Sequence, residues 1–276
     1  MSTRPLGLAA LGFLELDPPS LVAVAARAGF ASVTLRTRAA MPGGAEHPVP
    51  AGGRSAIETR ARMRDTGVTV AQVELIALTR ELDVRDCRPM LEDGAALGAT
   101  RVVATGDDPD GAVVAARLAA LCELAASLGM TVDLEFMPFR CVGTLAQALD
   151  ALARAAQPNA RVMVDALHLF RSGGSVEALR AAPADRLGMC QLCDAPLAAP
   201  PAHGLATEAR ERRLLPGEGE LPLPELLRAL PPGTPLAAEV PLAGRFPDRS
   251  AAERAQYLYE ATATLVERVL ERAASR

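Results

Sequence analysis

Short apolar runs alternate with longer amphipathic stretches along the whole chain. The runs are rich in residues that favour buried strands, and the stretches have the Ala, Leu and Arg content of helices. Eight strands are predicted, at residues 6–14, 31–36, 69–78, 101–105, 131–137, 161–164, 188–192 and 235–239. Eight helices are predicted between and after them, at residues 19–28, 55–65, 85–97, 111–128, 145–156, 176–181, 224–230 and 250–272.

This alternation predicts one α/β fold. Several amphipathic stretches end in a glycine that leads into the next apolar run, as helices commonly end before a strand. A unit of about 34 residues matches one strand and one helix, and strict alternation implies parallel strands. Eight units favour closure of the sheet, and no G-x-G-x-x-G follows the first run to support a dinucleotide-binding fold. We therefore predict a single (β/α)8 TIM barrel that occupies residues 1–276 as one domain.

Two segments interrupt the alternation, at residues 37–54 and 194–222. Both follow predicted strands, and the loops after the strands of a (β/α)8 barrel form its catalytic face. Neither segment has the character of a domain linker, because the alternation resumes directly after each. We therefore expect both loops to lie on the face that carries the active site.

The composition excludes several classes of function. Half of the residues are hydrophobic and 22% are charged, which fits a soluble protein with a large core. A formal net charge of −4 leaves no basic surface for nucleic acid or for a membrane. No apolar run is long enough to span a membrane, and the N-terminus lacks the order of a signal peptide. We expect a cytoplasmic protein with no nucleic-acid or membrane partner.

Five cysteines are scattered along the chain, at positions 87, 122, 141, 190 and 193. An odd number in apolar surroundings predicts reduced thiols rather than a disulfide framework. Cys190 and Cys193 form a C-x-x-C pattern, but their neighbours predict a strand rather than the helix N-terminus of a redox motif. We interpret both as core thiols on opposite faces of one strand.

Polar residues occupy the ends of the last four predicted strands, where barrel strands should be apolar. They are Glu135 in TVDLEFMPF, Asp165 in RVMVDALHLF, Gln191 in GMCQLCDAP and Glu239 in PLAAEVP. The ends of neighbouring strands converge on one half of the barrel mouth. Buried carboxylates are costly unless they are paired or bind a cation, so a divalent metal ion would compensate for this set. The alternative is a set of separate ion pairs with loop arginines such as Arg140, Arg171 and Arg213.

The second half of the chain resembles the xylose-isomerase-like barrel superfamily of sugar-phosphate isomerases and epimerases. The segments that carry the resemblance are LEFMPF, VDALHLFRSGG, QLCDAP, RRLLPGEGELPL and AAEVP. The first half is similar only in the order of its elements. The resemblance implies one Mg²⁺, Mn²⁺ or similar ion, held by Glu135, Asp165, Gln191 and Glu239. It also implies that His168 and Arg213 contact the substrate or support the metal ligands.

Position 191 departs from the pattern of many epimerases in this superfamily, which carry histidine there. Glutamine in a Q-x-x-D-A-P phrase also resembles the 3-dehydroshikimate dehydratases of the same superfamily. The type of reaction therefore stays open between isomerisation and dehydration. All-oxygen ligands favour Mg²⁺ or Mn²⁺ over Zn²⁺.

The predicted chemistry is the removal of an α-proton from a small polyhydroxy carbonyl compound, with the metal as a Lewis acid. In an isomerase or epimerase, Glu135 and Glu239 would serve as both metal ligands and catalytic acid and base, and His168 would orient the substrate. In a dehydratase, His168 would be the base. Arg213 would bind a substrate oxyanion or carboxylate. Two further candidate substrate contacts are Glu74 in the third predicted strand and Arg36 in the second.

Five other residues have a weaker link to this site. His47 and His203 lie in the two long loops and are interpreted as solvated residues. Asp194 follows the seventh predicted strand, where it either accepts a hydrogen bond near the site or begins the loop. Gly217 and Gly219 predict a tight turn rather than a phosphate-binding loop.

Two other classes of function compete with a metal-dependent isomerase or dehydratase. Apurinic endonucleases belong to the same superfamily, but they need several metals, many histidines and a basic surface, whereas this chain has three histidines. A catalytically inactive binding barrel would not explain four candidate ligands at successive strand ends. We therefore predict a metal-dependent isomerase or epimerase, with a carbon–oxygen lyase as the alternative. A homodimer is a further expectation.

Overall fold

The eight strands form a closed barrel in which every neighbouring pair is parallel. The computed structural model describes residues 4–40 and 43–274. β1 pairs with both β2 and β8, so the sheet has no free edge. The strands are β1 (Leu6–Leu8), β2 (Ser32–Arg36), β3 (Thr69–Leu78), β4 (Arg101–Gly106), β5 (Thr131–Glu135), β6 (Ala160–Asp165), β7 (Leu187–Leu192) and β8 (Leu236–Ala238). The predicted (β/α)8 TIM barrel is confirmed.

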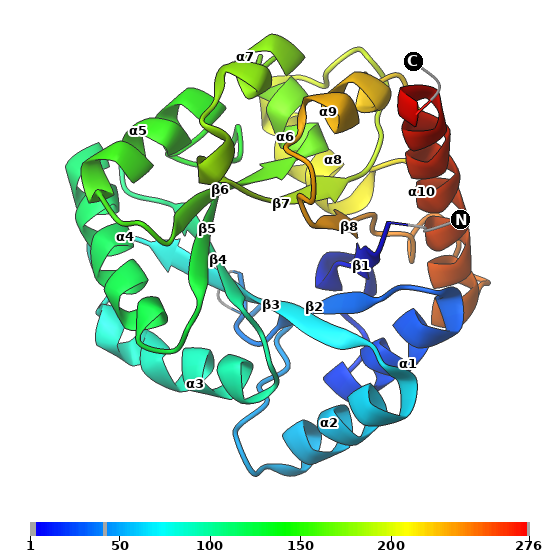
Figure 1. The fold of residues 1–276 in the computed structure, drawn as a ribbon, viewed down its shortest axis with the longest axis horizontal. Coiled ribbons are helices and arrows are strands. Elements are labelled where there is room, and N and C mark those ends of the chain that lie inside the picture. Colours follow the sequence, from blue (N-terminus) through cyan, green and yellow to red (C-terminus); the bar gives the residue numbers. More distant parts are fainter. Residues whose placement is uncertain (1–3, 41–42, 275–276) are drawn as a thin grey trace.

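Helices surround the barrel and follow the strands in order around the ring (Figure 1). They are α1 (Pro18–Ala28), α2 (Arg54–Thr66), α3 (Arg88–Ala96), α4 (Gly111–Ala126), α5 (Leu145–Ala155), α6 (Ala166–Arg171), α7 (Val176–Ala181), α8 (Leu205–Glu211), α9 (Leu223–Ala229) and α10 (Ala251–Ala274). α10 packs against α1 and α9, so the last helix closes the ring beside the first. Phe30 and Tyr259 make an edge-to-face contact near this closure, with 5.2 Å between ring centroids.

The ends of the helices follow capping signals in the sequence. Asp17 accepts the backbone N–H of Ser20 at the start of α1, and Gly29 ends that helix at a φ of 103°. Asp165 caps α6 in the same way, because its side chain accepts the backbone N–H of His168. One carboxylate oxygen of Asp165 is therefore fixed by the helix, and the other faces the barrel mouth.

An ion pair between a buried aspartate and a partly exposed arginine lies in the barrel below the mouth. Arg101 Nη1 lies 3.2 and 3.3 Å from the two carboxylate oxygens of Asp133, which is fully buried. Asp133 reaches across the barrel to β7, where a Cβ on Gly188 would lie 2.8 Å from the carboxylate. This pair was not predicted from the sequence, although Asp133 interrupts an apolar strand two residues before Glu135.

One predicted strand is wrong over most of its length. The apolar run at residues 6–14 forms a strand only at Leu6–Leu8, and Ala10–Phe13 is a 3-10 helix. Gly12 permits this turn because the backbone approaches the Val240 carbonyl oxygen, 2.6 Å from where a Cβ would stand. A short buried strand and a short buried 3-10 helix have the same apolar pattern, so the pattern did not distinguish them.

Two short helices at the barrel mouth were not predicted. α6 directly follows β6, and α8 lies within the loop at residues 194–222. They contain 6 and 7 residues, too few to show helical periodicity. They are important for the site because they carry His168 and Arg210.

The thiols of Cys190 and Cys193 are free and fully buried, as predicted, although Cys193 lies one residue beyond β7. Cys141 is exposed, so the expected apolar surroundings are wrong for that residue. No helix in the described part of the chain is long and apolar enough to cross a membrane.

Candidate functional site

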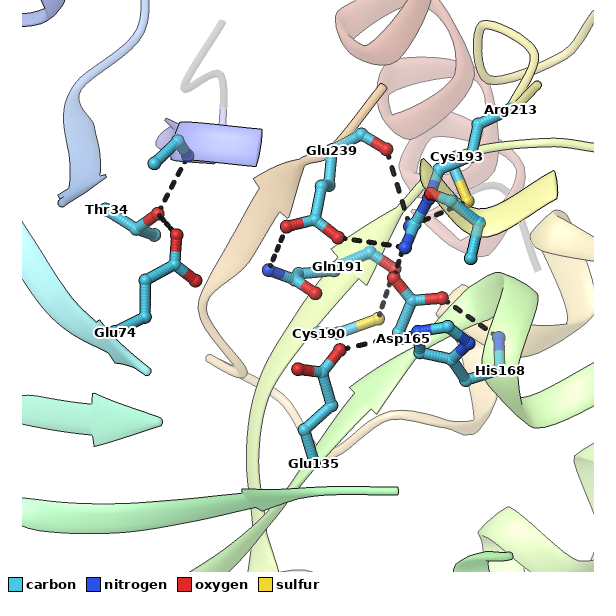
Figure 2. Close-up of polar contacts among 12 residues, drawn as sticks. Thr34, Glu74, Glu135, Asp165, His168, Cys190, Gln191, Cys193, Arg213 and Glu239 are labelled. Carbon is cyan, nitrogen blue, oxygen red and sulfur yellow. Dashed lines mark hydrogen bonds and ion pairs between the residues drawn. The ribbon is translucent and has the colours of Figure 1, made fainter. Parts of the chain in front are cut away.

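The four predicted ligands come together at the carboxyl ends of β5 to β8 (Figure 2). Glu135 and Asp165 are the last residues of their strands, Gln191 is the last but one of β7, and Glu239 follows β8. Asp165 pairs in register with Gln191, and Gln191 pairs with Ala237, so the strand ends lie level. All four side chains are buried. We call Glu135, Asp165 and Glu239 the carboxylate cluster.

Arg213 lies between two members of this cluster. Its Nη1 is 2.5 Å from Asp165 Oδ2, and its Nη2 is 3.1 Å from Glu239 Oε2. The residue is only 2% exposed, and its Nε donates to the Ala209 carbonyl oxygen. The guanidinium group is thus a buried counter-ion that bridges β6 and β8.

The other two arginines in the ion-pair alternative do not contact the carboxylate cluster. Arg140 pairs with Asp107, and Arg171 pairs with Glu208 of α8. Of the three arginines, only Arg213 therefore pairs with the carboxylate cluster, as the ion-pair alternative expected. Glu135 has no arginine partner among the described residues.

Glu135 lies beside Asp165 and His168 at the other end of the cluster. His168 Nε2 is 3.7 Å from Glu135 Oε1. One ligand atom from each of Glu135, Asp165 and His168 lies within 4.8 Å of the other two, a separation that a single metal ion could bridge. His168 is thus placed at the site, as predicted, although it also offers a nitrogen to a cation there.

Gln191 presents an oxygen without a partner to the same region. Its Nε2 donates to Glu239 Oε1 at 2.9 Å, whereas its buried Oε1 accepts no hydrogen bond. Buried acceptors are almost always satisfied, so an orphaned amide oxygen among carboxylates fits a cation ligand. Three carboxylates and one arginine carry an excess of two negative charges, which a divalent ion would neutralise. The residues present therefore fit the predicted metal.

The pKa values show how poorly the cluster is compensated by protein groups alone. Burial, with the nearby charges of Glu239 and Asp165, raises the pKa of Glu135 well above its usual range. Burial also raises the pKa of Glu239 to about 8, although Arg213 opposes the shift. Without a cation, both glutamates therefore favour the protonated form, and a bound cation would lower the pKa of each.

The pKa values of Asp165 and His168 are lowered, in contrast to those of the two glutamates. Burial alone would raise the pKa of Asp165, but the adjacent Arg213 and the His168 backbone N–H lower it. Burial and the charge of Arg213 lower the pKa of His168 to about 4, against the attraction of Asp165. His168 is therefore a neutral imidazole near pH 7, and its buried Nδ1 has no hydrogen-bond partner.

Glu74 and Arg36, the two further candidate substrate contacts, lie on the opposite wall of the mouth. Glu74 is buried, and Arg36 Nη2 lies 3.5 Å from its Oε1. Thr34, which the sequence analysis did not identify, donates from its hydroxyl to the same oxygen at 3.2 Å. Figure 2 shows Glu74 facing the carboxylate cluster from β3. Glu74 and Arg36 line one cavity with Glu135 and Glu239 of the cluster, together with Phe139, Arg140, His168 and Arg210.

His47 and His203 lie away from this cavity. His47 Nε2 is 2.9 Å from the Leu14 carbonyl oxygen, and His203 is exposed on the loop before α8. Of the three histidines, the structure brings only His168 to the candidate site.

Asp194 organises the loop that carries Arg213. Its buried carboxylate accepts the backbone N–H groups of Ala195, Gly217 and Leu221. Its backbone forms an antiparallel bridge with Leu214, the residue after Arg213. Asp194 therefore positions the arginine through the loop, without contacting the carboxylate cluster.

Gly219 is required by this arrangement. A Cβ at position 219 would lie 2.4 Å from both Ala195 O and Asp194 Oδ1. We expect Gly219→Ala to lower the free energy of unfolding by about 1–3 kcal/mol, as overpacking of a buried contact does. Urea denaturation would measure the loss. Gly111→Ala is the matched control, because a Cβ there meets no atom within 4 Å. Equal stability of the two variants would contradict the role of Gly219.

Phe139 and Arg210 also line the cavity and were not predicted from the sequence, and Arg140 was predicted only as a possible ion-pair partner. Phe139 contacts His168 edge to face, with 5.5 Å between ring centroids, and Arg140 follows it in the chain. The Arg210 guanidinium lies over the Phe139 ring at 5.6 Å from the centroid. The only available signal was position: two of them follow Glu135 closely, and Arg210 precedes Arg213 by three residues.

The fold of the chain is similar to that of several solved proteins. IolI, a protein with a bound zinc atom, has a TM-score of 0.81 and 18% identity over 96% of this chain and 99% of that one. The probable 3-DHS dehydratase AsbF from Bacillus anthracis has a TM-score of 0.76 and 15% identity, over 94% and 98% of the two chains. D-allulose 3-epimerase from Methylomonas sp. has a TM-score of 0.71 and 18% identity, over 97% and 98%. At these identities the similarity concerns the fold alone.

Comparison with curated proteins gave no match. A protein family described as "Xylose isomerase-like TIM barrel" matches residues 22–261, which include all eight candidate site residues and most of the barrel. The solved structures that share this fold include an epimerase and a probable dehydratase. The chain therefore belongs to the xylose isomerase-like TIM barrel family.

Proposed function

We propose that the chain is a divalent-metal-dependent isomerase or epimerase that acts on a small polyhydroxy carbonyl compound. The observation that carries the proposal is the carboxylate cluster, in which three buried acidic groups face a single arginine. Burying unpaired charge costs several kcal/mol per ion, so such a cluster needs a further cation. Glu135, Asp165, Gln191 and Glu239 would hold Mg²⁺ or Mn²⁺, and the zinc atom in IolI supports a divalent metal in this fold.

When bound, the metal would act as a Lewis acid that stabilises negative charge on the substrate oxygens during enolisation. Glu135 and Glu239 stand on β5 and just beyond β8, on two sides of the cluster (Figure 2). One glutamate, in its ionised form, would take the α-proton from one face of the substrate, and the other, in its protonated form, would give its proton to the opposite face. The result is inversion at that carbon, with no net change in atoms.

His168 and the opposite wall would orient the substrate. The neutral imidazole of His168 has a free buried Nδ1 and can donate to or accept from a hydroxyl group. Glu74 would accept from a second hydroxyl, and Arg36 would donate to a third oxygen from the other side of the cavity. Arg213 would bind a substrate oxyanion beside the cluster.

A dehydratase is the second candidate, and the position of His168 favours it. This side chain is uncharged near pH 7, lines the cavity and lies 3.7 Å from Glu135. As the base, it would take the α-proton, and the β-hydroxyl group would leave with a proton as water. The probable dehydratase AsbF among the solved structures supports this alternative.

One experiment tests both candidates. Chelator-stripped protein is mixed with keto-sugars, hydroxypyruvate, inosose and 3-dehydroshikimate in D₂O, with and without Mg²⁺ or Mn²⁺, and followed by proton NMR. We expect exchange of an α-proton only with metal present. An isomerase then yields a saturated isomer, whereas a dehydratase yields an unsaturated product. Absence of exchange with every compound would reject both in favour of a binding barrel.

The metal should also stabilise the fold. A ligand present at about 100 times its Kd stabilises the folded state by about 2.7 kcal/mol. We therefore expect Mn²⁺ or Mg²⁺ to raise the Tm of the stripped protein, as measured by differential scanning calorimetry. Asp165→Asn should reduce this shift, because it removes one of the three negative charges. If titration calorimetry detects no binding of a divalent ion, the metal assignment fails.

We further propose that the protein is cytoplasmic, and that it forms a homodimer.

A further inference from the structure

Two arginines lie at the rim of the cavity beside Phe139. Arg140 directly follows Phe139, and the Arg210 guanidinium lies over its ring. Both line the same cavity as Glu135, His168 and Glu239. We call Arg140 and Arg210 the arginine rim. A site that bound only a neutral polyol would have no need of two guanidinium groups at its entrance.

The arginine rim has unused hydrogen-bonding capacity. Arg140 uses Nη1 for its ion pair with Asp107, but its buried Nε has no partner. Arg210 forms no ion pair with any residue in the described part of the chain and is held only by the Phe139 ring. An exposed guanidinium over an aromatic face stays free to bind a second group with its N–H donors.

The charges around the cavity also indicate that it binds an anionic group. The residues that line it or pair with its lining carry five carboxylates, those of Glu74, Asp107, Glu135, Asp165 and Glu239, and four arginines, Arg36, Arg140, Arg210 and Arg213. A divalent ion at the carboxylate cluster would turn an excess of one negative charge into an excess of one positive charge. The uncompensated group is then Arg210, which a monoanion would neutralise.

The position of the rim sets where that negative charge would lie. Phe139 contacts His168, and His168 lies 3.7 Å from Glu135, so only two side chains separate Arg210 from the cluster. A molecule of several carbon atoms could place hydroxyl groups at the cluster and an anionic group at the rim. A planar guanidinium binds a carboxylate through two parallel hydrogen bonds.

We propose that the arginine rim is an anion subsite, and that the substrate of this enzyme is a polyhydroxy carbonyl compound bearing a carboxylate. The identity of the reacting centre rests on the proposed function, whereas the subsite itself does not. A carboxylate carries the single negative charge that the cavity lacks, and a phosphate monoester would carry nearly two at neutral pH.

Binding of unreactive probes tests the subsite separately from catalysis. Mn²⁺-loaded protein is titrated calorimetrically with quinate and gluconate, and with their neutral partners methyl quinate and gluconamide. myo-Inositol 1-phosphate and myo-inositol form the phosphate arm. None of these compounds has an enolisable ketone or aldehyde, so absence of α-proton exchange with keto compounds would sink the proposed function and leave this measurement intact.

We expect at least one carboxylate to bind at least about tenfold more tightly than its neutral partner. Arg210→Met and Arg140→Met should each reduce that preference by about tenfold to a hundredfold, the loss of a hydrogen bond to a charged group. Arg212→Met is the matched control, since Arg212 is an exposed neighbour outside the cavity. The Arg212→Met variant should prefer the carboxylate over its neutral partner as strongly as the unaltered protein does.

Three results would overturn the proposal. Equal binding of every carboxylate and its neutral partner would show that the rim takes no anion. A preference that survives both Arg210→Met and Arg140→Met would assign the carboxylate to the metal instead of the rim. If the phosphate group of myo-inositol 1-phosphate increased affinity over myo-inositol by more than either carboxylate does over its neutral partner, the carboxylate would be rejected as the ligand. Because Arg210 is exposed, its variant should fold even if Arg140→Met does not.

Discussion

Glu239→Gln is expected to abolish turnover while leaving the protein folded. Glutamine keeps the size of the side chain, but it cannot exchange a proton with the substrate, and it weakens the ligand set by one charge. Loss of a general acid or base costs about 10²–10⁴-fold in rate. Mutation of residues that only hydrogen-bond to metal ligands typically lowers metal affinity by about 10–100-fold. Loss of a charged ligand should therefore lower the affinity for the metal by at least about tenfold.

Calorimetric titration with Mn²⁺ and α-proton exchange in D₂O measure the two effects of Glu239→Gln. The control is Glu225→Gln, because Glu225 is an exposed residue of α9 whose one ion pair among the described residues is with Arg228. A Glu239→Gln variant that binds metal and exchanges the α-proton like the unaltered protein would exclude Glu239 from the site.

Arg213→Met should have opposite effects on the metal-free fold and on the metal. The substitution removes the counter-ion between Asp165 and Glu239 and leaves two buried carboxylates. Breaking a buried ion pair costs about 3–5 kcal/mol, so the metal-free protein should lose stability by about that amount. The affinity for Mn²⁺ should rise by at least about tenfold, because the positive charge that competes for both carboxylates is gone.

Arg171→Met gives a matched control for Arg213→Met. Arg171 also forms a buried ion pair, with Glu208, but it does not touch the carboxylate cluster. Its loss should destabilise the fold without changing the affinity for Mn²⁺. Urea denaturation of the stripped proteins and calorimetric titration measure the two quantities. Weaker Mn²⁺ binding by the Arg213→Met variant would mean that Arg213 supports the metal site. Unchanged binding would mean that Arg213 does not affect the affinity for the metal.

Much of the fold could be predicted because each barrel strand buries both faces and leaves an apolar run in the sequence. The alternation of these runs with amphipathic stretches is a local signal, and it predicted the order of all eight strands. The failures occurred where an element was too short to have a period. The segment Ala10–Phe13 was predicted as strand, α8 was predicted as part of a loop, and α6 was not predicted.

The site was predictable where a polar residue interrupts such a run. Glu135, Asp165, Gln191 and Glu239 all stand out against apolar neighbours, and the structure places them together. Arg213 was predicted as a substrate contact, but its bridge between two carboxylates depends on how a long loop folds back. Arg210 could not be found because exposed arginines are common in helices, and only the approach of α8 to Phe139 distinguishes this one.

The hydrogen bonds of Asp194 divide the long loop into a fixed base and a variable insert. The base is tied at Leu214, Gly217 and Leu221, next to the arginine that bridges the cluster. The insert, residues 195–212, leaves and re-enters this base at neighbouring points and carries α8 with Arg210. The proposed metal ligands lie outside the insert, which reaches the site through the Ala209 carbonyl oxygen that accepts from Arg213 Nε. Of the proposed arginine rim, the insert carries Arg210 but not Arg140. We therefore expect that grafting this insert between related barrels would alter the preference for an anionic group and leave the residues of the metal site in place.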